Sequence, residues 1–259
     1  MSARTVLETR GLGRAFGGII ALENLDLILA EGKISAIIGP NGAGKTTLFN
    51  LIAGVYSASS GQVLFKGVPL NRTPAHKRAT MGIARTFQHV LLFSNMTVLE
   101  NVMAGQHPRS RYGFFEAALR LPKAHREEET ISLKAKQYLN LVGLGMYADR
   151  NPLGLPLGQQ KLLTIARAMA TEPKLLLLDE PGAGLNALEK QGLSELIRRI
   201  RDMGITIILV EHDMDLVMGI AEWVIVLDSG QKIAEGTASQ IQKNKRVIAA
   251  YLGDEEAIE

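Results

Sequence analysis

Gly39-Pro40-Asn41-Gly42-Ala43-Gly44-Lys45-Thr46 is the stretch of sequence that decides the fold of this chain. Its two glycines, the lysine and the hydroxyl residue have the spacing of a phosphate-binding loop. The mostly apolar residues 34–38 precede it and the amphipathic residues 47–53 follow, so we expect the loop to join a strand to a helix. Backbone N–H groups of such a loop and of the helix N-terminus surround an anion. The stretch therefore predicts a nucleotide site in which Lys45 reaches the β- and γ-phosphates and Thr46 ligates Mg²⁺.

Composition limits the class of protein. The 259 residues are enough for one large domain or a domain with a subdomain, and a hydrophobic content of 46% allows a substantial core. Without cysteine the chain has no disulfide, thiolate zinc site or cysteine nucleophile, which suits a reducing compartment. The net charge is only +3 and no dense basic run stands out, so we expect no nucleic acid partner.

Membrane-spanning and exported classes are disfavoured by the distribution of apolar residues. No apolar run approaches the roughly 18 residues of a membrane span. The N-terminal Met1-Ser2-Ala3-Arg4 lacks the apolar core of a signal peptide. We therefore expect a soluble, cytosolic chain that can still dock onto a membrane protein.

The remaining pattern predicts an α/β fold with a mostly parallel sheet and an antiparallel β portion. Residues 4–38 are rich in strand signals, and residues 175–178 and 205–210 are apolar runs typical of strands buried on both faces. Residues 186–203 have the pattern of an amphipathic helix. Its expected core-facing residues are Leu193, Leu196, Ile197 and Ile200. A hairpin that begins at Trp223 and a final helix close the chain.

The middle of the chain predicts a separate helical part. Thr97-Val98-Leu99-Glu100 has the spacing of a capping box that opens a helix. Residues 111–144 have helical character, mixed charge and few strand signals. We therefore expect a single domain, residues 1–259, with a helical subdomain over residues 90–155 inserted into a nucleotide-binding α/β core. That core consists of residues 1–89 and 156–259.

Polar residues follow two of the buried strands, at the edge where parallel sheets bind ligands. Asp179 ends one apolar strand, as the Mg²⁺-holding aspartate of a P-loop NTPase requires, and Glu180 comes next. Glu180 can orient and deprotonate the water that attacks a γ-phosphate. His212 follows the other strand and can contact the γ-phosphate or that water. Taken alone, the acidic pair also fits a solvated loop and the histidine a structural role, but the phosphate-binding loop favours catalysis.

In this order and spacing, the motifs resemble those of the nucleotide-binding subunits of ABC transporters, over nearly the whole chain. After the glycine loop come Gln88 in "RTFQ", Leu155-Pro156-Leu157-Gly158-Gln159 at the place of the signature motif (the signature segment), Asp179-Glu180 and His212. Ala183-Gly184-Leu185-Asn186 occupies the D-loop position. The resemblance implies the ABC ATPase fold, a P-loop NTPase core with an inserted α-helical subdomain, and ATP and Mg²⁺ as its ligands.

The resemblance also implies a role for each matching residue. Glu180, His212 and Gln88 are the implied catalytic residues, and Thr46, Gln88 and Asp179 are the implied metal ligands. The implied ATP-binding residues are Phe16, Gly39, Pro40, Asn41, Gly42, Ala43, Gly44, Lys45, Thr46, Thr47, Leu155, Gly158 and Gln159. In the family, the position of Phe16 carries an aromatic ring that packs against adenine. In the family, the signature motif contacts the γ-phosphate of the nucleotide held by the other subunit, and the resemblance implies the same role for the signature segment.

Four segments are similar to the branch of the family that serves branched-chain amino acid importers: "FGGIIAL", "RTFQHVLLFSNMTVLENV", "EHDMDLVMGIA" and "NKRVIAAYLG". Phe114-Phe115, in a further similar segment, fits a helical core and a partner contact equally well. The resemblance implies an ATPase at the cytoplasmic face of the inner membrane, whose ATP-driven dimer closure and opening energises amino acid uptake. Its implied partners are a second, probably different ABC ATPase subunit, two membrane-spanning permease subunits and an external solute-binding protein.

Other functions stay open at this point. The same motor can serve a urea or amide importer or a lipid exporter, because the partner proteins choose the cargo. A nucleotide-gated binding switch without turnover is a different class, which the intact Lys45, Asp179, Glu180 and His212 disfavour. A DNA- or ribosome-associated protein of this family is disfavoured because the sequence has no second ATPase domain, coiled-coil insertion or basic arm.

The signature segment departs from the family's usual Leu-Ser-Gly-Gly-Gln. Pro156 takes the Ser position and Leu157 the first Gly position. Proline has neither a hydroxyl nor a backbone N–H, and each lost hydrogen bond to a charged phosphate costs about 1.5–3 kcal/mol. We therefore expect an asymmetric pair, in which this chain's glycine loop and Glu180 work with the intact signature of a different subunit.

Overall fold

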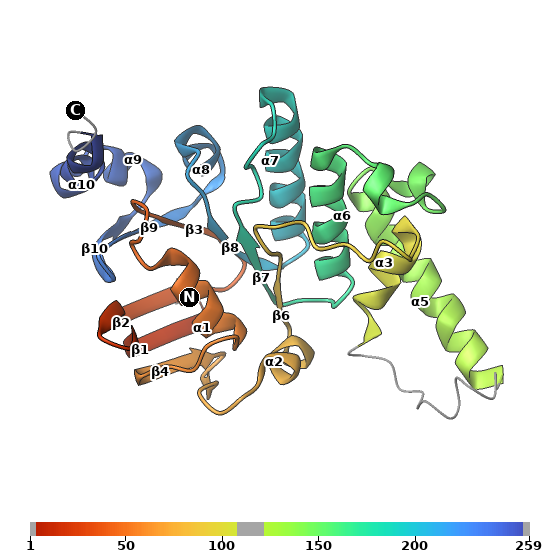
Figure 1. Ribbon diagram of the computed structural model, residues 1–259, viewed down its shortest axis with the longest axis horizontal. Helices are drawn as coiled ribbons and strands as arrows, with labels where there is room; N and C mark the ends of the chain where they lie inside the picture. The colour runs from red at the N-terminus through yellow and green to blue at the C-terminus, as the bar shows by residue number, and fades with distance from the viewer. Residues whose placement is uncertain (1–3, 108–121, 256–259) are drawn as a thin grey trace.

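The computed structural model describes residues 4–107 and 122–255, without the side chains of residues 122–126 and 252–255. Phe114-Phe115 lies outside the described residues. Within those ranges no helix has the length and apolar character that crossing a bilayer demands. The elements are β1 (Thr5–Phe16), β2 (Ile19–Ala30), β3 (Ile34–Ile38), α1 (Lys45–Ala53), β4 (Ser60–Phe65), β5 (Val68–Pro69), α2 (Ala75–Met81), β6 (Ile83–Arg85), α3 (Val98–Ala104), α5 (Pro122–Leu141), η2 (Gly145–Tyr147), η3 (Pro152–Gly154), α6 (Leu157–Met169), β7 (Leu175–Asp179), α7 (Ala187–Asp202), β8 (Thr206–Val210), α8 (Met214–Ile220), β9 (Trp223–Asp228), β10 (Gln231–Gly236), α9 (Ala238–Gln242) and α10 (Lys245–Glu255) (Figure 1).

Two sheets form the framework of the fold. The larger has the strand order β10-β9-β3-β8-β7-β6 and is parallel except for β10, which pairs antiparallel with β9. The smaller, β2-β1-β4-β5, is antiparallel. β3, β7 and β8 are buried along their whole length, which explains why their sequences are mostly apolar. The predicted α/β class with a mostly parallel sheet and an antiparallel portion is confirmed.

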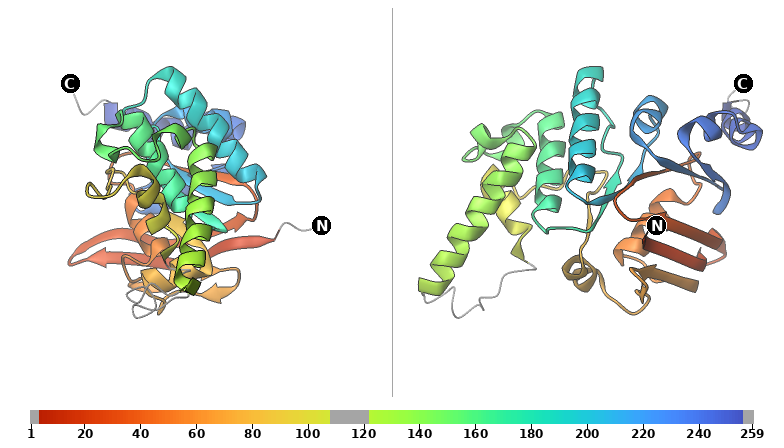
Figure 2. Two further views of the ribbon diagram at one scale, coloured as in Figure 1. Left: turned by 90° about the vertical axis from the view of Figure 1, so that its right-hand side faces the viewer. Right: turned by 180° about the vertical axis from the view of Figure 1, so that it is seen from behind.

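The two faces of the larger sheet pack against different elements. One face gathers Ala36, Leu176 and Leu209 with helices α3, α5, α6, α7 and α8. The other gathers Ile37 and Leu177 with α1 and the antiparallel sheet. Successive side chains of a strand point to opposite faces, so α1 and α6 cover opposite faces of one sheet. The right-hand view of Figure 2 shows the antiparallel strands at one end of the molecule and α3 and α5 at the other.

Among the described residues between β6 and β7, helices are the only regular secondary structure. The Thr97 hydroxyl accepts the N–H of Glu100, and the Glu100 carboxylate accepts the N–H of Thr97, so the predicted capping box of α3 is confirmed. Helices α3, α5 and α6 pack together through apolar side chains. These include Val98, Val102, Ala135, Leu139 and Leu163. The subdomain boundaries at residues 90 and 155 remain a prediction, since α6 belongs to the same helical packing.

Some boundaries differ from the sequence predictions. α6 begins at Leu157, inside the signature segment. Pro156 can serve as its N-cap because an N–H there would have no intrahelical acceptor. The predicted final helix is two helices, α9 and α10, because Asn244 interrupts it and its Oδ1 accepts the N–H of Arg246. α7 buries the predicted residues, Leu193, Leu196, Ile197 and Ile200.

Candidate active site

The loops that follow β3, β6, β7 and β8 lie at one edge of the larger sheet. These four strands are parallel neighbours, so their carboxyl ends point the same way (Figure 1). The glycine loop follows β3, Gln88 follows β6, Asp179 ends β7 with Glu180 directly after it, and His212 follows β8. The topology therefore brings together predicted residues that are far apart in the sequence.

The glycine loop turns from β3 into α1 through backbone conformations that favour glycine. Gly39 and Gly44 have φ angles of +148° and +97°. A Cβ on Gly39 would overlap the carbonyl oxygen of Leu227, and a Cβ on Gly44 would lie 2.6 Å from that of Ala21. The loop is thus held between β9 and β2, and a side chain at either glycine would force the backbone to move.

Lys45, the first residue of α1, is buried inside this loop. Its Nζ donates to the carbonyl oxygens of Gly39 and Pro40 at 2.6 and 2.8 Å. Burial lowers the pKa of Lys45, and the negative charge of Glu180 opposes that shift. Thr46 beside it is exposed, and the first N–H groups of a helix have no intrahelical acceptor. A cation, an exposed hydroxyl and a positive helix end therefore meet at one place, which suits a phosphate group and its metal ion.

The Glu180 carboxylate is the point on which the predicted catalytic residues converge. Gln88 Nε2 donates to Glu180 Oε2 at 2.8 Å, and His212 Nε2 lies 3.1 Å from Oε1. Glu180 has a φ angle of +46°, a value uncommon for a residue with a side chain, at the turn that follows β7. Its side chain is 18% exposed and that of His212 is 45% exposed, so the pair is open to water. The structure brings the three residues together, and their catalytic roles stay predictions.

Asp179 is buried at the end of β7 and pairs with an arginine. Arg85 Nη2 donates to Asp179 Oδ2 at 2.7 Å, and Nη1 donates to Asn50 Oδ1 at 2.6 Å. The backbone N–H of Asp179 donates to Thr86 Oγ1 at 3.3 Å. Across the described ranges, no group of three or more His, Cys, Asp or Glu side chains could hold a metal ion. A metal here would therefore depend on Asp179, the Thr46 hydroxyl and oxygen atoms of a bound nucleotide.

The signature segment leads into α6 and packs against the D-loop. Leu155 and Gly158 are buried, and Gln159 is half-buried. Leu157 is 51% exposed, and a Cβ added to Gly184 would lie 3.3 Å from its side chain. The structure does not bring this segment to the glycine loop of the same chain, since α6 and α1 cover opposite faces of the sheet.

Two buried charged residues, Lys161 and Glu211, bind backbone groups of residues 180–183. Lys161 Nζ, on α6, donates to the carbonyl oxygens of Glu180 and Ala183 at 3.0 and 2.5 Å. Glu211 Oε1 accepts the N–H of Gly182 at 2.5 Å. Burial lowers the pKa of Lys161 and raises the pKa of Glu211. The helix that begins with the signature segment is thereby tied to the turn that carries Glu180.

Phe16 ends β1 at the tip of the β1–β2 hairpin. Its ring meets Tyr56 edge-on at a centroid distance of 5.1 Å, and the Arg14 guanidinium lies 4.5 Å from its centroid. The residue remains 38% exposed. The same hairpin passes close to Gly44 at Ala21, so it flanks the start of α1. The packing of Phe16 against adenine stays a prediction.

An apolar groove of about 590 Å³ lies between the segment after β6 and helices α2, α3 and α6. Phe87, Leu91 and Phe93 line it, and Arg85 lies at its side. Arg167 Nη2 donates to the carbonyl oxygen of Leu91, and its guanidinium lies 5.5 Å from the centroid of Phe93. The groove therefore adjoins the residues that hold Asp179.

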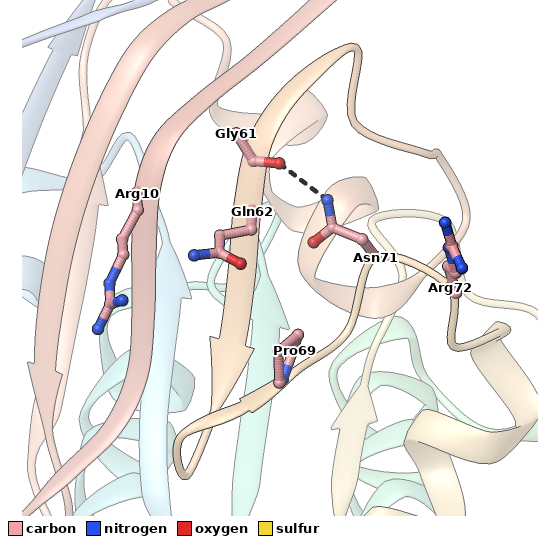
Figure 3. Close-up of a pocket in the computed structure, with 6 residues that line it drawn as sticks. All are labelled: Arg10, Gly61, Gln62, Pro69, Asn71 and Arg72. Atoms are coloured by element: carbon pink, nitrogen blue, oxygen red, sulfur yellow. Dashed lines mark hydrogen bonds between the residues drawn. The ribbon is translucent and has the colours of Figure 1, made fainter.

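A different hollow, of about 510 Å³, lies over β1, β4 and β5 of the antiparallel sheet (Figure 3). In it Asn71 donates to the carbonyl oxygen of Gly61 at 2.8 Å, which ties the chain after β5 to β4. Arg10, also in this hollow, is paired with Glu8. None of the predicted site residues lines it, so the predicted chemistry belongs to the edge of the larger sheet.

Sequence reasoning missed three residues that hold the site: Arg85, Lys161 and Glu211. Arg85 opens the "RTFQ" motif and ends β6, so its place at a strand end was a usable signal. Lys161 lies one turn before the buried Ile165, and a charged residue on the buried side of a helix indicates a specific partner. Glu211 directly follows β8 and precedes His212. At that place either the carboxylate of Glu211 or the imidazole of His212 is a candidate site residue.

The chain has many relatives among known protein sequences. The profile of a family described as "ABC transporter" matches residues 22–183, and one described as "Branched-chain amino acid ATP-binding cassette transporter" matches residues 231–257. The high-affinity branched-chain amino acid transport ATP-binding protein LivG of Escherichia coli K12 is 43% identical, over 97% of this chain and 99% of its own length. The corresponding protein BraF of Pseudomonas aeruginosa is 41% identical over the same shares.

Solved structures with the same architecture extend the comparison. The ADP conformation of MJ1267, an ATP-binding cassette of an ABC transporter, has a TM-score of 0.84 and 31% identity, and the alignment covers 96% of this chain and 99% of that chain. The dimeric structure of MJ0796, a bacterial ABC transporter cassette, has a TM-score of 0.78 and 25% identity, with 90% and 98% covered. The similarity therefore spans both sheets and the helices between them.

Proposed function

Since this chain belongs to the ABC transporter family, as an ATPase of that family, we propose that it hydrolyses ATP to energise the import of branched-chain amino acids. The observation that carries the proposal is the convergence of Gln88 and His212 on the Glu180 carboxylate, at the sheet edge that also bears the glycine loop. The names of the similar LivG and BraF proteins and the profile match at residues 231–257 support the cargo.

The glycine loop fits the phosphates of ATP. Lys45 and the N-terminus of α1 supply positive charge for the β- and γ-phosphates. In the described part of the chain, the Asp179 carboxylate has its hydrogen bond on Oδ2, which leaves Oδ1 for a metal ion. Thr46, Asp179 and Gln88 would hold Mg²⁺, which neutralises charge on the β- and γ-phosphate oxygens when bound. The exposed ring of Phe16 would pack against the adenine.

Glu180 would act as the general base of hydrolysis. A water molecule attacks the γ-phosphorus, Glu180 accepts its proton, and the bond to the bridging oxygen of ADP breaks. Gln88 and His212 each contact one oxygen of the carboxylate, and these two contacts fix its orientation toward the water. His212 can donate to Glu180 through Nε2 when that nitrogen carries the proton.

The position of the signature segment supports a two-subunit arrangement. This segment and the glycine loop belong to opposite faces of the sheet, so neither can close the other's site within one chain. A second ABC ATPase subunit would place its own signature over the ATP held here. The γ-phosphate then joins the two subunits, and hydrolysis removes that contact and lets them separate.

The apolar groove beside Arg85 supports contact with membrane proteins. Phe87, Leu91 and Phe93 would receive a segment from one of two membrane-spanning permease subunits. The chain would then act at the cytoplasmic face of the inner membrane, and an external solute-binding protein would deliver the amino acid. Residues 90–155 would form the helical subdomain on one side of this groove, and residues 1–89 and 156–259 the nucleotide-binding core.

We propose further that the two ATPase subunits are different chains. Pro156 cannot donate a hydrogen bond to a phosphate, and Leu157 places a half-exposed isobutyl group at the start of α6. The site completed by this chain's signature segment would be weak. The site built on Lys45 and Glu180 would be strong, because a partner with an intact signature would complete it.

Transport by the purified complex tests the proposal. The complex is placed in proteoliposomes with ATP on the side of this chain, and with labelled leucine and its binding protein on the other. We expect ATP-dependent leucine transport, and we expect Glu180→Gln to reduce it at least about a hundredfold, as loss of a general base does, while ATP binding persists. Transport of urea, amides or lipid instead of leucine would assign the motor to another cargo. ATP binding without turnover in the unmodified complex would indicate a nucleotide-gated switch.

A further inference from the structure

Arg85 joins the two elements that carry the proposed metal ligands Thr46 and Asp179. One guanidinium nitrogen donates to Asn50 on α1 at 2.6 Å, and another donates to Asp179 at the end of β7 at 2.7 Å. Asn50 lies four positions after Thr46, so both are on the same face of α1. The planar guanidinium of Arg85 therefore connects the side of α1 that carries Thr46 to the end of β7 that carries Asp179.

The guanidinium of Arg85 is held in one place by packing as well as by hydrogen bonds. Its centre lies 5.7 Å from the ring centroid of Phe49 and 5.1 Å from that of Phe87. The side chain is 7% exposed and that of Asp179 is 4% exposed. Since a guanidinium is rigid and its nitrogen atoms have a fixed spacing, α1 and β7 are held at a fixed distance from each other.

We propose that Arg85 is a positioning residue that sets the separation of Thr46 and Asp179 and thereby matches the site to Mg²⁺. The inference rests on the proposed function, which supplies the nucleotide and the metal ion. Mg²⁺ requires near-octahedral ligands at about 2.0–2.1 Å, whereas Ca²⁺ accepts longer distances and irregular geometry. A site whose two protein ligands are held rigidly can therefore prefer Mg²⁺, and a loosened site loses that preference.

Charge and position must be separated in the test, because Arg85 is itself a cation. Its positive charge repels a metal ion at Asp179, so a neutral variant gains affinity from lost repulsion while it loses affinity from lost positioning. Arg85→Lys keeps the charge, but an ammonium on a flexible stem cannot span Asn50 and Asp179 as the planar fork does. The lysine variant therefore isolates the positioning effect.

The experiment titrates Mg²⁺ and, separately, Ca²⁺ into the full-length chain saturated with ADP, with calorimetry as the readout. We expect Arg85→Lys to raise the Mg²⁺ concentration for half-saturation about tenfold, the lower range seen when a residue that orients a metal ligand is changed. The Ca²⁺ value should change less, so the preference for Mg²⁺ falls. Asn50→Leu keeps the Asp179 pair and should change the preference in the same direction by a smaller factor. ADP binding in EDTA should stay within about twofold of the unmodified chain, since the phosphate contacts of Lys45 are intact.

Arg78→Lys is the matched control. Arg78, on α2, is also buried, but its Nη1 donates to the backbone carbonyl oxygens of Leu51 and Ile52 at the far end of α1. This control should lower the melting temperature without changing the metal preference. An unchanged Mg²⁺ preference in Arg85→Lys, or an equal change in Arg78→Lys, would overturn the inference and leave the proposed function standing. A full-length chain that binds no nucleotide would remove both.

Discussion

The glycine loop and the signature segment belong to opposite faces of one sheet, and they differ in the polar groups that they offer to a phosphate. Lys45 donates to two carbonyl groups of its own loop, and Glu180 is held by Gln88 and His212. Leu157, in the signature segment, is half-exposed, and Pro156 offers no donor. Under the proposed asymmetry, this chain keeps its own half of a hydrolysis site but lacks the donors with which a signature segment completes a partner's site.

The largest expected effect comes from making the same Glu→Gln substitution in this chain and, separately, in its partner subunit. In a complex with a different ATPase partner, Glu180→Gln in this chain should reduce ATP turnover at least about a hundredfold. The equivalent Glu→Gln change in the partner should reduce turnover less than about twofold, since that site depends on Pro156 and Leu157 and already contributes little. Steady-state phosphate release from the two single-variant complexes measures this. Equal losses from both would contradict the asymmetry.

A second prediction concerns nucleotide binding by the glycine loop alone. Lys45→Ala should weaken ATP binding to the isolated chain about ten- to a hundredfold, the value of a hydrogen bond between charged groups. Lys33→Ala is the control, because Lys33 precedes β3, is exposed and pairs with Glu222 at 3.9 Å. Binding is measured by calorimetry with a non-hydrolysable ATP analogue. Similar affinities of the two variants would show that the loop does not hold the phosphates.

Lys161 connects the helix that begins with the signature segment to the turn that carries Glu180, and it provides the third prediction. Lys161→Met leaves the partly buried carbonyl oxygens of Glu180 and Ala183 without their donor, which should lower the free energy of unfolding by about 1–3 kcal/mol. Burial lowers the pKa of Lys161 in the folded chain below its ordinary 10.5, so the unfolded chain binds the proton more tightly. Stability due to this group is therefore present above pH 10.5 and is lost as the pH falls through the folded pKa.

Urea unfolding of the Lys161→Met variant and the unmodified chain, at neutral pH and near pH 10, measures both effects. The unmodified chain should gain stability relative to the variant as the pH rises, because Lys161 then loses a charge that is costly to bury. A difference that stays constant between the two pH values would contradict the lowered pKa.

Much of the candidate site could be predicted from the sequence because its residues mark the ends of strands. An apolar run followed by a polar residue locates Asp179 and His212, and the glycine pattern locates Lys45. Contacts between elements could not be predicted in this way. The pairing of Arg85 with Asp179 and Asn50 depends on how α1, β6 and β7 are placed in space, and no local pattern of residues carries that information.

The smallest expected effect is a repair of the signature segment. Pro156→Ser together with Leu157→Gly restores the hydroxyl and the small residue of the family's usual motif. One regained hydrogen bond to a phosphate corresponds to a gain of about tenfold in the closed, ATP-bound pair, the lower end of the range for charged acceptors. Glycine at the first position of α6 is a poor helix former and should lower the chain's own stability by up to about 1 kcal/mol. Tighter closure together with lower stability would therefore show that residues 156 and 157 affect contact with the partner and stability of the chain in opposite directions. Leu153→Ser, which changes an exposed leucine just outside the segment, should leave closure unchanged. A repaired chain that closes no better than this control would mean that the signature segment, as it stands, already contacts its partner's nucleotide fully.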